Sequence, residues 1–137
     1  MSDHQNGLVR GIVRRLGEDA SVAALLGEPA RIWDQPPEDA GFPHVRIGAC
    51  DSRPVAADGG AVEHRLSLTV VSTFSGAEEA RAVAAAVRAA LEDARLEADG
   101  VRTVSLGVSL VETFRATDLG RAYAVIRLRA VTEESGE

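Results

Sequence analysis

The stretch that decides the fold is EHRLSLTVVSTF, residues 63–74, the clearest strand of the chain. Apolar and polar side chains alternate along it, as expected of a strand with one buried and one exposed face. At about 3.3 Å per residue the strand is ~40 Å long. It is therefore expected to extend beyond a single layer of helices, since strands usually have only about 5–6 residues. Its apolar side comprises Leu66, Leu68, Val70 and Phe74.

A long helix is expected directly after this strand, from residue 75 to about residue 96. Ser75 followed by Glu78 has the spacing of a capping box with Ser75 as the N-cap. We expect this helix to lie close against the sheet, because its inner stripe contains many alanines. The stripe comprises Ala80, Val83, Ala84, Val87 and Leu91.

Residues 101–114 are expected to form one long strand or two, and residues 121–132 form the last expected strand. Asp99 and Gly100 supply the turn before the first of them. Gly107 is the expected position of a β-bulge in that strand. Alternation places one apolar set of each strand in the core. The two sets are Val104, Leu106, Val108, Leu110 and Phe114, and Ala122, Ala124, Ile126, Leu128 and Ala130.

The N-terminal part of the chain predicts a helical hairpin. One helix covers residues 4–16 and ends at Gly17. A second helix covers residues 19–26, with Asp19 able to cap its free N–H groups. The apolar stripe of the first helix comprises Leu8, Ile12 and Leu16.

Weaker extended segments follow the hairpin. Short strands are expected at residues 31–34 and 44–49. Residues 35–41, which contain two prolines and a glycine, are expected to form a loop. Residues 51–62 are expected to form a long loop that contacts a partner, because unstructured loops of ~12 residues are uncommon without a function. The apolar face of the second strand comprises Val45, Ile47 and Ala49.

These elements together predict an α+β fold. It consists of a mainly antiparallel sheet of long strands, an N-terminal helical hairpin and one long amphipathic helix packed on the sheet. The 137 residues, 45% hydrophobic and 26% charged, have the size and composition of one ordinary domain. We expect a single domain over residues 1–137, an ordered core over about 5–133 and an acidic C-terminal tail.

Charge and composition argue against several functions. The formal net charge is −6, which argues against a surface dedicated to gripping DNA. All 15 basic residues are arginines, so a phosphate-binding loop and Schiff-base catalysis, which need lysine, are excluded. Cys50 is the only cysteine, so no internal disulfide forms. Because a signal segment and an apolar run of ~20 residues are both lacking, we expect no membrane contact and a cytoplasmic location before assembly.

The side chains that carry chemistry do not form a recognisable constellation. His4, His44 and His64 lack the spacing of a metal site, and a structural role is favoured for each. The serines lack the Gly-x-Ser-x-Gly pattern of a nucleophile elbow. The five aromatic residues are not interleaved with basic ones, as stacking on nucleic acid requires. We therefore expect no enzymatic activity, no metal and no cofactor.

Outward-facing arginines on the long strands are the most conspicuous surface feature. Arginine suits interfaces, because its planar fork binds carboxylates with two hydrogen bonds. Such arginines either pack subunits together in a ring or decorate a solvated face, and the residues alone favour neither. If the surface is an interface between subunits, the candidate residues are Arg53, Val55, Glu63, Arg65, Arg127 and Arg129.

The order and spacing of several segments resemble small tail-completion proteins, the tail terminators of long-tailed phages and of gene transfer agents. The resemblance covers residues 5–133, and no single motif carries it alone. In the first half the segments are VAALLG (22–27), RIWDQPP (31–37) and FPHVRIG (42–48). In the second half they are EHRLSLTV (63–70), AAAVRAAL (84–91) and RLRAVT (127–132).

This resemblance implies a hexameric ring at the head-proximal end of a tail tube. Such a ring stops growth of the tube and docks the tail onto the head, and DNA passes through its lumen without being read. The implied partners are further copies of the chain, the tail tube protein and a stopper or adaptor protein on the head side. The implied final location is the tail or neck of a virion or gene transfer agent particle.

Other functions remain open at this point. Within the same class, the chain could be a stopper or a tube subunit. From a different class, it could be a small ligand-binding regulatory α+β domain, which would need a closed pocket with convergent polar groups.

Overall fold

The computed structural model describes residues 3–55, 60–73, 77–116 and 119–135, and within them six strands form one sheet. The order across the sheet is β1-β2-β3-β6-β5-β4. Neighbouring strands are antiparallel, except that β1 runs parallel to β2. The strands are β1 (Ile32–Trp33), β2 (His44–Pro54), β3 (Val62–Ser72), β4 (Glu97–Ala98), β5 (Val101–Ala116) and β6 (Arg121–Glu134).

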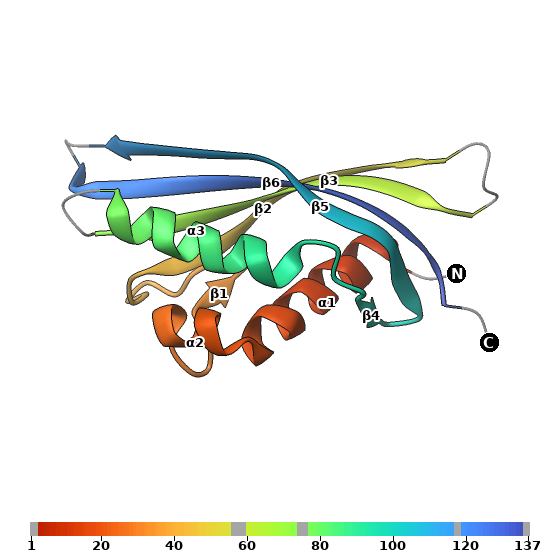
Figure 1. Cartoon of the computed structure of the whole chain (residues 1–137), viewed down its shortest axis with the longest axis horizontal. Helices are drawn as coiled ribbons and strands as arrows, with labels where there is room; N and C mark the ends of the chain where they lie inside the picture. The colour runs from red at the N-terminus through yellow and green to blue at the C-terminus, as the bar shows by residue number, and fades with distance from the viewer. Residues whose placement is uncertain (1–2, 56–59, 74–76, 117–118, 136–137) are drawn as a thin grey trace.

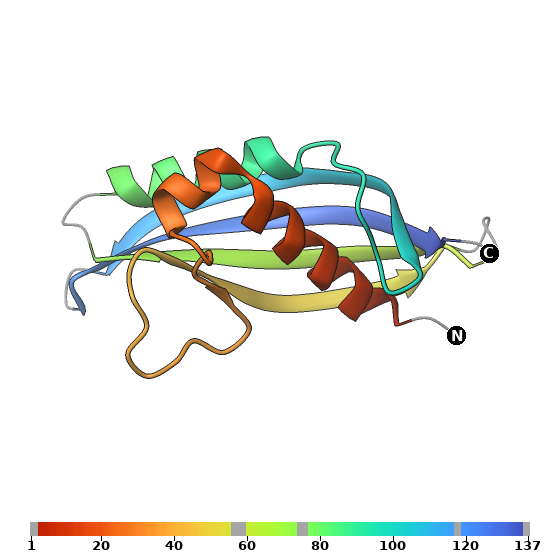
Figure 2. The same cartoon turned by 90° about the horizontal axis from the view of Figure 1, so that it is seen from below.

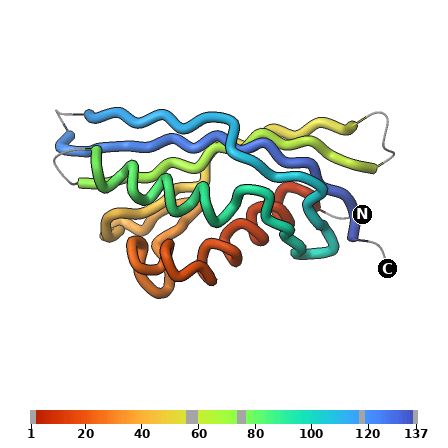
Figure 3. The backbone as a smooth tube through the Cα atoms, in the orientation of Figure 1, coloured from red at the N-terminus to blue at the C-terminus, as the bar shows by residue number. Residues whose placement is uncertain are grey.

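Three helices lie on the same face of this sheet, which confirms the predicted α+β fold (Figure 1). The opposite face is uncovered by helices throughout the described chain, and the long strands extend beyond the helical layer (Figure 3). The N-terminal hairpin crosses beneath the strands, as the view from below shows (Figure 2). The helices are α1 (His4–Glu18), α2 (Ala20–Leu26) and α3 (Glu78–Leu91).

The hairpin forms as predicted, apart from the end of its first helix. Asp19 caps α2, because its carboxylate accepts a hydrogen bond from the Val22 N–H at 3.0 Å. Gly17 does not end α1, and the helix continues to Glu18. The extended backbone of Asp19 is what separates the two helices, since Asp19 is both the C-cap of α1 and the N-cap of α2.

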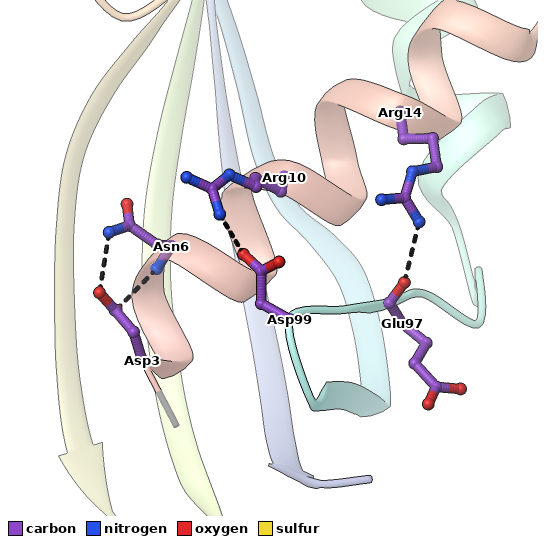
Figure 4. A network of polar contacts seen from close by, with 6 residues as sticks. All are labelled: Asp3, Asn6, Arg10, Arg14, Glu97 and Asp99. Atoms are coloured by element: carbon purple, nitrogen blue, oxygen red, sulfur yellow. Dashed lines mark hydrogen bonds and ion pairs between the residues drawn. The ribbon is translucent and has the colours of Figure 1, made fainter. Parts of the chain in front are cut away.

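Polar contacts hold α1 against β4 and the turn that follows it (Figure 4). Arg10 forms an ion pair with Asp99, and Arg14 donates to the carbonyl of Glu97 at 3.2 Å. Backbone contact is also close, because a Cβ atom on Gly7 would lie 2.9 Å from the Cβ of Val101. Only glycine permits this approach of the helix to the sheet.

The helix α3 has the predicted inner stripe but different ends. Its N-cap is Ala77, without a side-chain cap, so the expected capping box is wrong; Ser75 itself lies outside the described residues. The helix ends at Leu91 rather than near residue 96. After it the backbone turns to β5, where the Asp93 N–H donates to the Leu106 carbonyl at 3.0 Å.

The predicted loop over residues 51–62 is wrong in its described part. Its first residues continue β2, where Asp51 pairs with Arg65 and Arg53 pairs with Glu63. The Val55 N–H then donates to the Ala61 carbonyl at 2.9 Å, so strand-like pairing runs past Pro54. The neighbouring strand β3 supplies the hydrogen bonds that hold this polar segment extended, although its composition is typical of a loop.

A bulge in β2 reverses the predicted orientation of Ala49. Gly48 and Ala49 together lie opposite a single residue of β3, Ser67. One extra residue reverses the side on which the following side chains point. Ala49 is therefore exposed, and Cys50 packs against the core in its place.

Two bulges also interrupt β5, and neither is at Gly107. Gly107 pairs directly with Arg129, whereas the extra residues are Val104 and Ser109. Beyond Ser109 the side chains change sides. Leu110 and Phe114, predicted to be buried, are 48% and 46% exposed on the uncovered face. Val104, also predicted to be buried, lies at the first bulge and is 59% exposed.

The hydrophobic core lies between the helices and the inner face of the sheet. The predicted inward residues of β3 and β6 that the structure describes are buried, as is the α3 stripe, and Phe74 lies outside the described residues. None of the helices in the described ranges has the length and hydropathy to cross a membrane. The largest core side chains include Leu8, Ile12, Leu16, Leu26, Leu68, Leu91, Ile126 and Leu128.

Candidate interaction surface

The uncovered face of the sheet is divided into two surfaces of different chemistry. One surface, the charged patch, comprises Asp51, Arg53, Glu63, Arg65, Arg127 and Arg129. The other, the apolar patch, comprises Leu110, Phe114, Tyr123 and Val125 on the β5–β6 hairpin, and the exposed Glu112 lies among them, paired with Val125. The two patches meet where Leu110 pairs with Arg127 across the strands.

The charged patch brings together five of the six residues predicted from the sequence. Arg53 pairs with Glu63, and Arg65 lies between Asp51 and Arg129 in the cross-strand register. The sixth residue, Val55, lies just past the end of β2, where its N–H donates to the Ala61 carbonyl.

The arginines of the charged patch are only partly neutralised. Arg129 donates through Nε to Glu63 Oε2 at 2.6 Å. Arg65 and Arg127 form no ion pair with any residue that the structure describes. Both are exposed, so their guanidinium groups are available to an anionic group of a partner.

The centre of the charged patch is hollowed. A shallow concavity of about 440 Å³ spans the middle of the sheet. Three guanidinium groups and the Asp51 carboxylate border it, and Ser67 and Ser109 add hydroxyl groups. Its full lining is Ala49, Asp51, Arg65, Leu66, Ser67, Ser109, Arg127, Leu128 and Arg129.

The apolar patch is built around a stacked aromatic pair. The rings of Phe114 and Tyr123 lie 5.3 Å apart, with 25° between their planes. Leu110 and Val125 extend this surface along the hairpin. Exposed aromatic residues next to arginine are typical of the energetic centres of protein interfaces.

The apolar patch does not follow from the alternation in the sequence, because the bulge at Ser109 shifts the later residues of β5 to the opposite face. One signal was nevertheless present in the sequence. In a regular strand, Glu112 lies on the same face as Leu110 and Phe114. If Leu110 and Phe114 were in the core, the Glu112 carboxylate would be buried as well. A buried unpaired carboxylate is costly, which favours the opposite facing.

An aromatic cluster closes the end of the uncovered face beside β1. His44 lies between Trp33 and Phe42, with ring centroids at 5.4 and 5.1 Å. Arg121 from β6 stacks over the Phe42 ring at 4.8 Å. The cluster fixes the point at which the loop between β1 and β2 rejoins the sheet.

A chain of hydrogen bonds joins α1 to the sheet on the inner face. The Ser52 hydroxyl lies 2.6 Å from His64 Nδ1, and His64 Nε2 lies 2.8 Å from the Thr132 hydroxyl. The same hydroxyl lies 2.7 Å from His4 Nδ1. This chain has no carboxylate to orient the histidine and His64 is fully buried, so its role is to hold the helix. The described residues also contain no group of three potential metal ligands.

The free energy of unfolding is expected to fall as the pH drops below about 6.5. Burial lowers the pKa of His64 and of His44 below the ordinary value. Below pH 6.5 the unfolded chain therefore binds protons that the folded chain does not. The loss is at most about 1.4 kcal/mol per pH unit for each histidine.

Urea unfolding between about pH 5 and pH 8 measures this dependence. The variant His44→Gln retains only the contribution of His64 and is expected to show a shallower profile. A wild-type profile that is flat or that rises toward pH 5 contradicts the assignment.

Comparison with known proteins finds a matching protein family and matching solved structures. The family model described as "Tail completion protein gp17" matches residues 10–133. Among solved structures, the chain is similar to a chain of the "Virion of native gene transfer agent (GTA) particle", with a TM-score of 0.84 and 26% sequence identity. That match covers 95% of this chain and 97% of the other. The search of curated proteins gives no match.

Proposed function

Because the chain belongs to the tail completion protein gp17 family, we propose that it forms a hexameric ring at the head-proximal end of a phage-like tail. In this role the ring ends growth of the tail tube and joins the tail to the head, while DNA passes through. The family assignment confirms the resemblance drawn from the sequence. It also confirms the expectation of a structural protein rather than an enzyme.

The structural similarity supports a location in the finished particle. The similar chain is part of a gene transfer agent virion and matches this one over nearly its whole length. By that analogy, the chain is present in the cytoplasm during assembly and then in the tail or neck of a virion or gene transfer agent particle. Its proposed partners are the tail tube protein and a stopper or adaptor on the head side.

The observation that carries the ring proposal is the uncovered face of the sheet. A face that combines an exposed phenylalanine, stacked on a tyrosine, with unpaired arginines has the composition of an interface core and rim. The charged patch and the apolar patch differ from each other, so two copies need not pair through the same surface around a twofold axis. Contact between different surfaces of successive copies is the type of contact that closes into a ring.

The acidic balance of the chain supports passage of DNA without retention. Each phosphate that a protein neutralises adds affinity, so a lumen that lets DNA slide should be neutral to acidic. With a net charge of −6, the chain can provide such a lumen if its arginines lie at subunit contacts. A ring in which Arg65, Arg127 and Arg129 all line the pore would contradict this arrangement.

Electron microscopy of particles assembled without this protein tests the proposal. We expect tail tubes of uncontrolled length and heads without tails, and we expect expression of the wild-type chain in the same cells to restore normal particles. Detached tails of normal length would instead indicate a stopper, and complete absence of tubes a tube subunit. Normal particles would overturn the tail assignment and favour a ligand-binding domain.

A further inference from the structure

We propose that the concave centre of the charged patch receives the acidic loop, residues 34–39, of a second copy of the chain. This inference rests on the proposed ring, because it names the contact that joins successive copies. The loop carries Asp34, Glu38 and Asp39, which are all exposed. The concavity carries the guanidinium groups of Arg65, Arg127 and Arg129.

The concavity has an excess of positive charge in an acidic protein. Three arginines border it, and the nearby carboxylates are Asp51 and Glu63. Only Arg129 is paired, through its contact with Glu63. Arg46 and Glu112 lie one row further along the same face, in the row of Thr69 and Val125, and add one charge of each sign. A carboxylate that enters this concavity therefore meets guanidinium groups able to bind it with two hydrogen bonds.

The acidic loop has the opposite character. Its three carboxylates form no ion pair within the described chain. Figure 2 shows the loop between β1 and β2, coloured orange, projecting sideways from the body of the molecule. The loop is thus a protrusion with three unpaired carboxylates beside one edge of the sheet, and Arg31, Arg46 and Arg121 lie near its base at His44.

The base of the loop is held in place, so docking orders little additional chain. Arg31 donates through Nε to the carbonyl of Pro43 at 2.8 Å. The His44 ring nitrogen Nδ1 lies 2.9 Å from the Gly41 carbonyl, and the Ala40 N–H donates to the Pro37 carbonyl at 3.1 Å. A loop that is ordered before binding loses less conformational entropy on binding.

The position of the loop in the fold favours a contact between copies. The loop rejoins the sheet at His44, at the first end of β2, whereas the concavity begins at Ala49, five residues further along that strand. This separation is roughly 15 Å at about 3.3 Å per residue. Loop and concavity are different surfaces, so their contact is head-to-tail and repeats from copy to copy.

Reciprocal charge reversal tests the contact. The loop variant carries Glu38→Arg and Asp39→Arg, and the pocket variant carries Arg65→Glu and Arg127→Glu. We expect each to reduce incorporation into tailed particles at least about tenfold, as a like-charge contact costs several kcal/mol. A chain with all four substitutions restores the attraction and is expected to return incorporation to within about threefold of wild type.

The control reverses two exposed carboxylates on the helical side of the molecule, Glu18→Arg and Glu28→Arg. It changes the net charge as much as the loop variant does, and it is expected to leave incorporation unchanged. Thermal unfolding of each purified chain separates loss of contact from loss of fold.

A second measurement does not depend on charge. Cysteines at Glu38 and Ser67 (Glu38→Cys, Ser67→Cys, in a Cys50→Ser background) are expected to be joined between chains by a short bis-maleimide in assembled particles. The matched pair Glu18→Cys and Ser67→Cys is expected to remain unlinked.

Three results overturn the inference and leave the proposed function standing. They are normal incorporation of the loop variant, failure of the four-substitution chain to recover, and absence of the Glu38–Ser67 cross-link. If only the pocket variant loses incorporation, the arginines bind a different anion, such as the DNA backbone. Absence of the wild-type chain from particles is a separate result, and it overturns the proposed function itself.

Discussion

Ile126→Ala is expected to lower the free energy of unfolding by about 2–5 kcal/mol, as other truncations of large buried side chains do. Ile126 is 0% exposed and lies in β6, the central long strand, on the face covered by the helices. Its neighbours belong to several elements of one tightly packed core, so they cannot close the cavity that the smaller side chain leaves. Urea unfolding at pH 8 measures the change.

The matched control is Leu110→Ala on the adjacent strand. Leu110 was predicted to be buried and is half exposed on the apolar patch, so its truncation is expected to cost less than about 1 kcal/mol in the isolated chain. Comparable losses for the two variants would mean that the bulge at Ser109 does not turn Leu110 outward.

Thr132→Val is expected to lower the free energy of unfolding by about 1–3 kcal/mol, although valine has nearly the shape of threonine. The Thr132 hydroxyl joins His64 to His4, and both Thr132 and His64 are 0% exposed. Without the hydroxyl, His64 Nε2 stays buried and loses its partner. The expected loss thus comes from an unsatisfied polar atom and not from a cavity.

Urea unfolding at pH 8, where the buried histidine is neutral, isolates this effect. Thr113→Val on β5 is the control, since Thr113 is half-buried beside α3 and contributes no hydrogen bond to the histidine chain. A Thr132→Val chain as stable as the wild type would show that the hydroxyl is not needed to hold α1.

Elements with an undisturbed pattern could be predicted from the sequence. The strands β3 and β6 alternate without interruption, and the stripe of α3 keeps helical spacing, so their buried faces are as expected. Propensity was a poor guide at residues 51–54, where Pro54 and polar neighbours are typical of a loop. Hydrogen bonds from β3 hold residues 51–54 extended, and the local sequence pattern does not indicate that such a partner strand is present.

The sequence predicts the charged patch of the candidate surface but not its apolar patch. Alternation in β3 and β6 accounts for Glu63, Arg65, Arg127 and Arg129, four of the five expected residues in the charged patch. The fifth, Arg53, was expected in a loop and lies on β2. The apolar patch depends on the bulge at Ser109, which shifts every later residue of β5 by one position. The only sign of this shift in the sequence is Glu112, whose carboxylate would be buried without it.

The bulge at Ser109 makes the chemistry of this surface depend on chain length as well as on residue type. A one-codon deletion there, with every other side chain retained, would turn Leu110 and Phe114 toward α3 and bring Val111 and Thr113 to the outside. Relatives could therefore gain or lose the aromatic patch through a single insertion or deletion. An alignment without a gap at this site would then match residues that lie on opposite faces of the sheet. The presence of this surface in a relative is therefore judged better from the strand register than from residue identity.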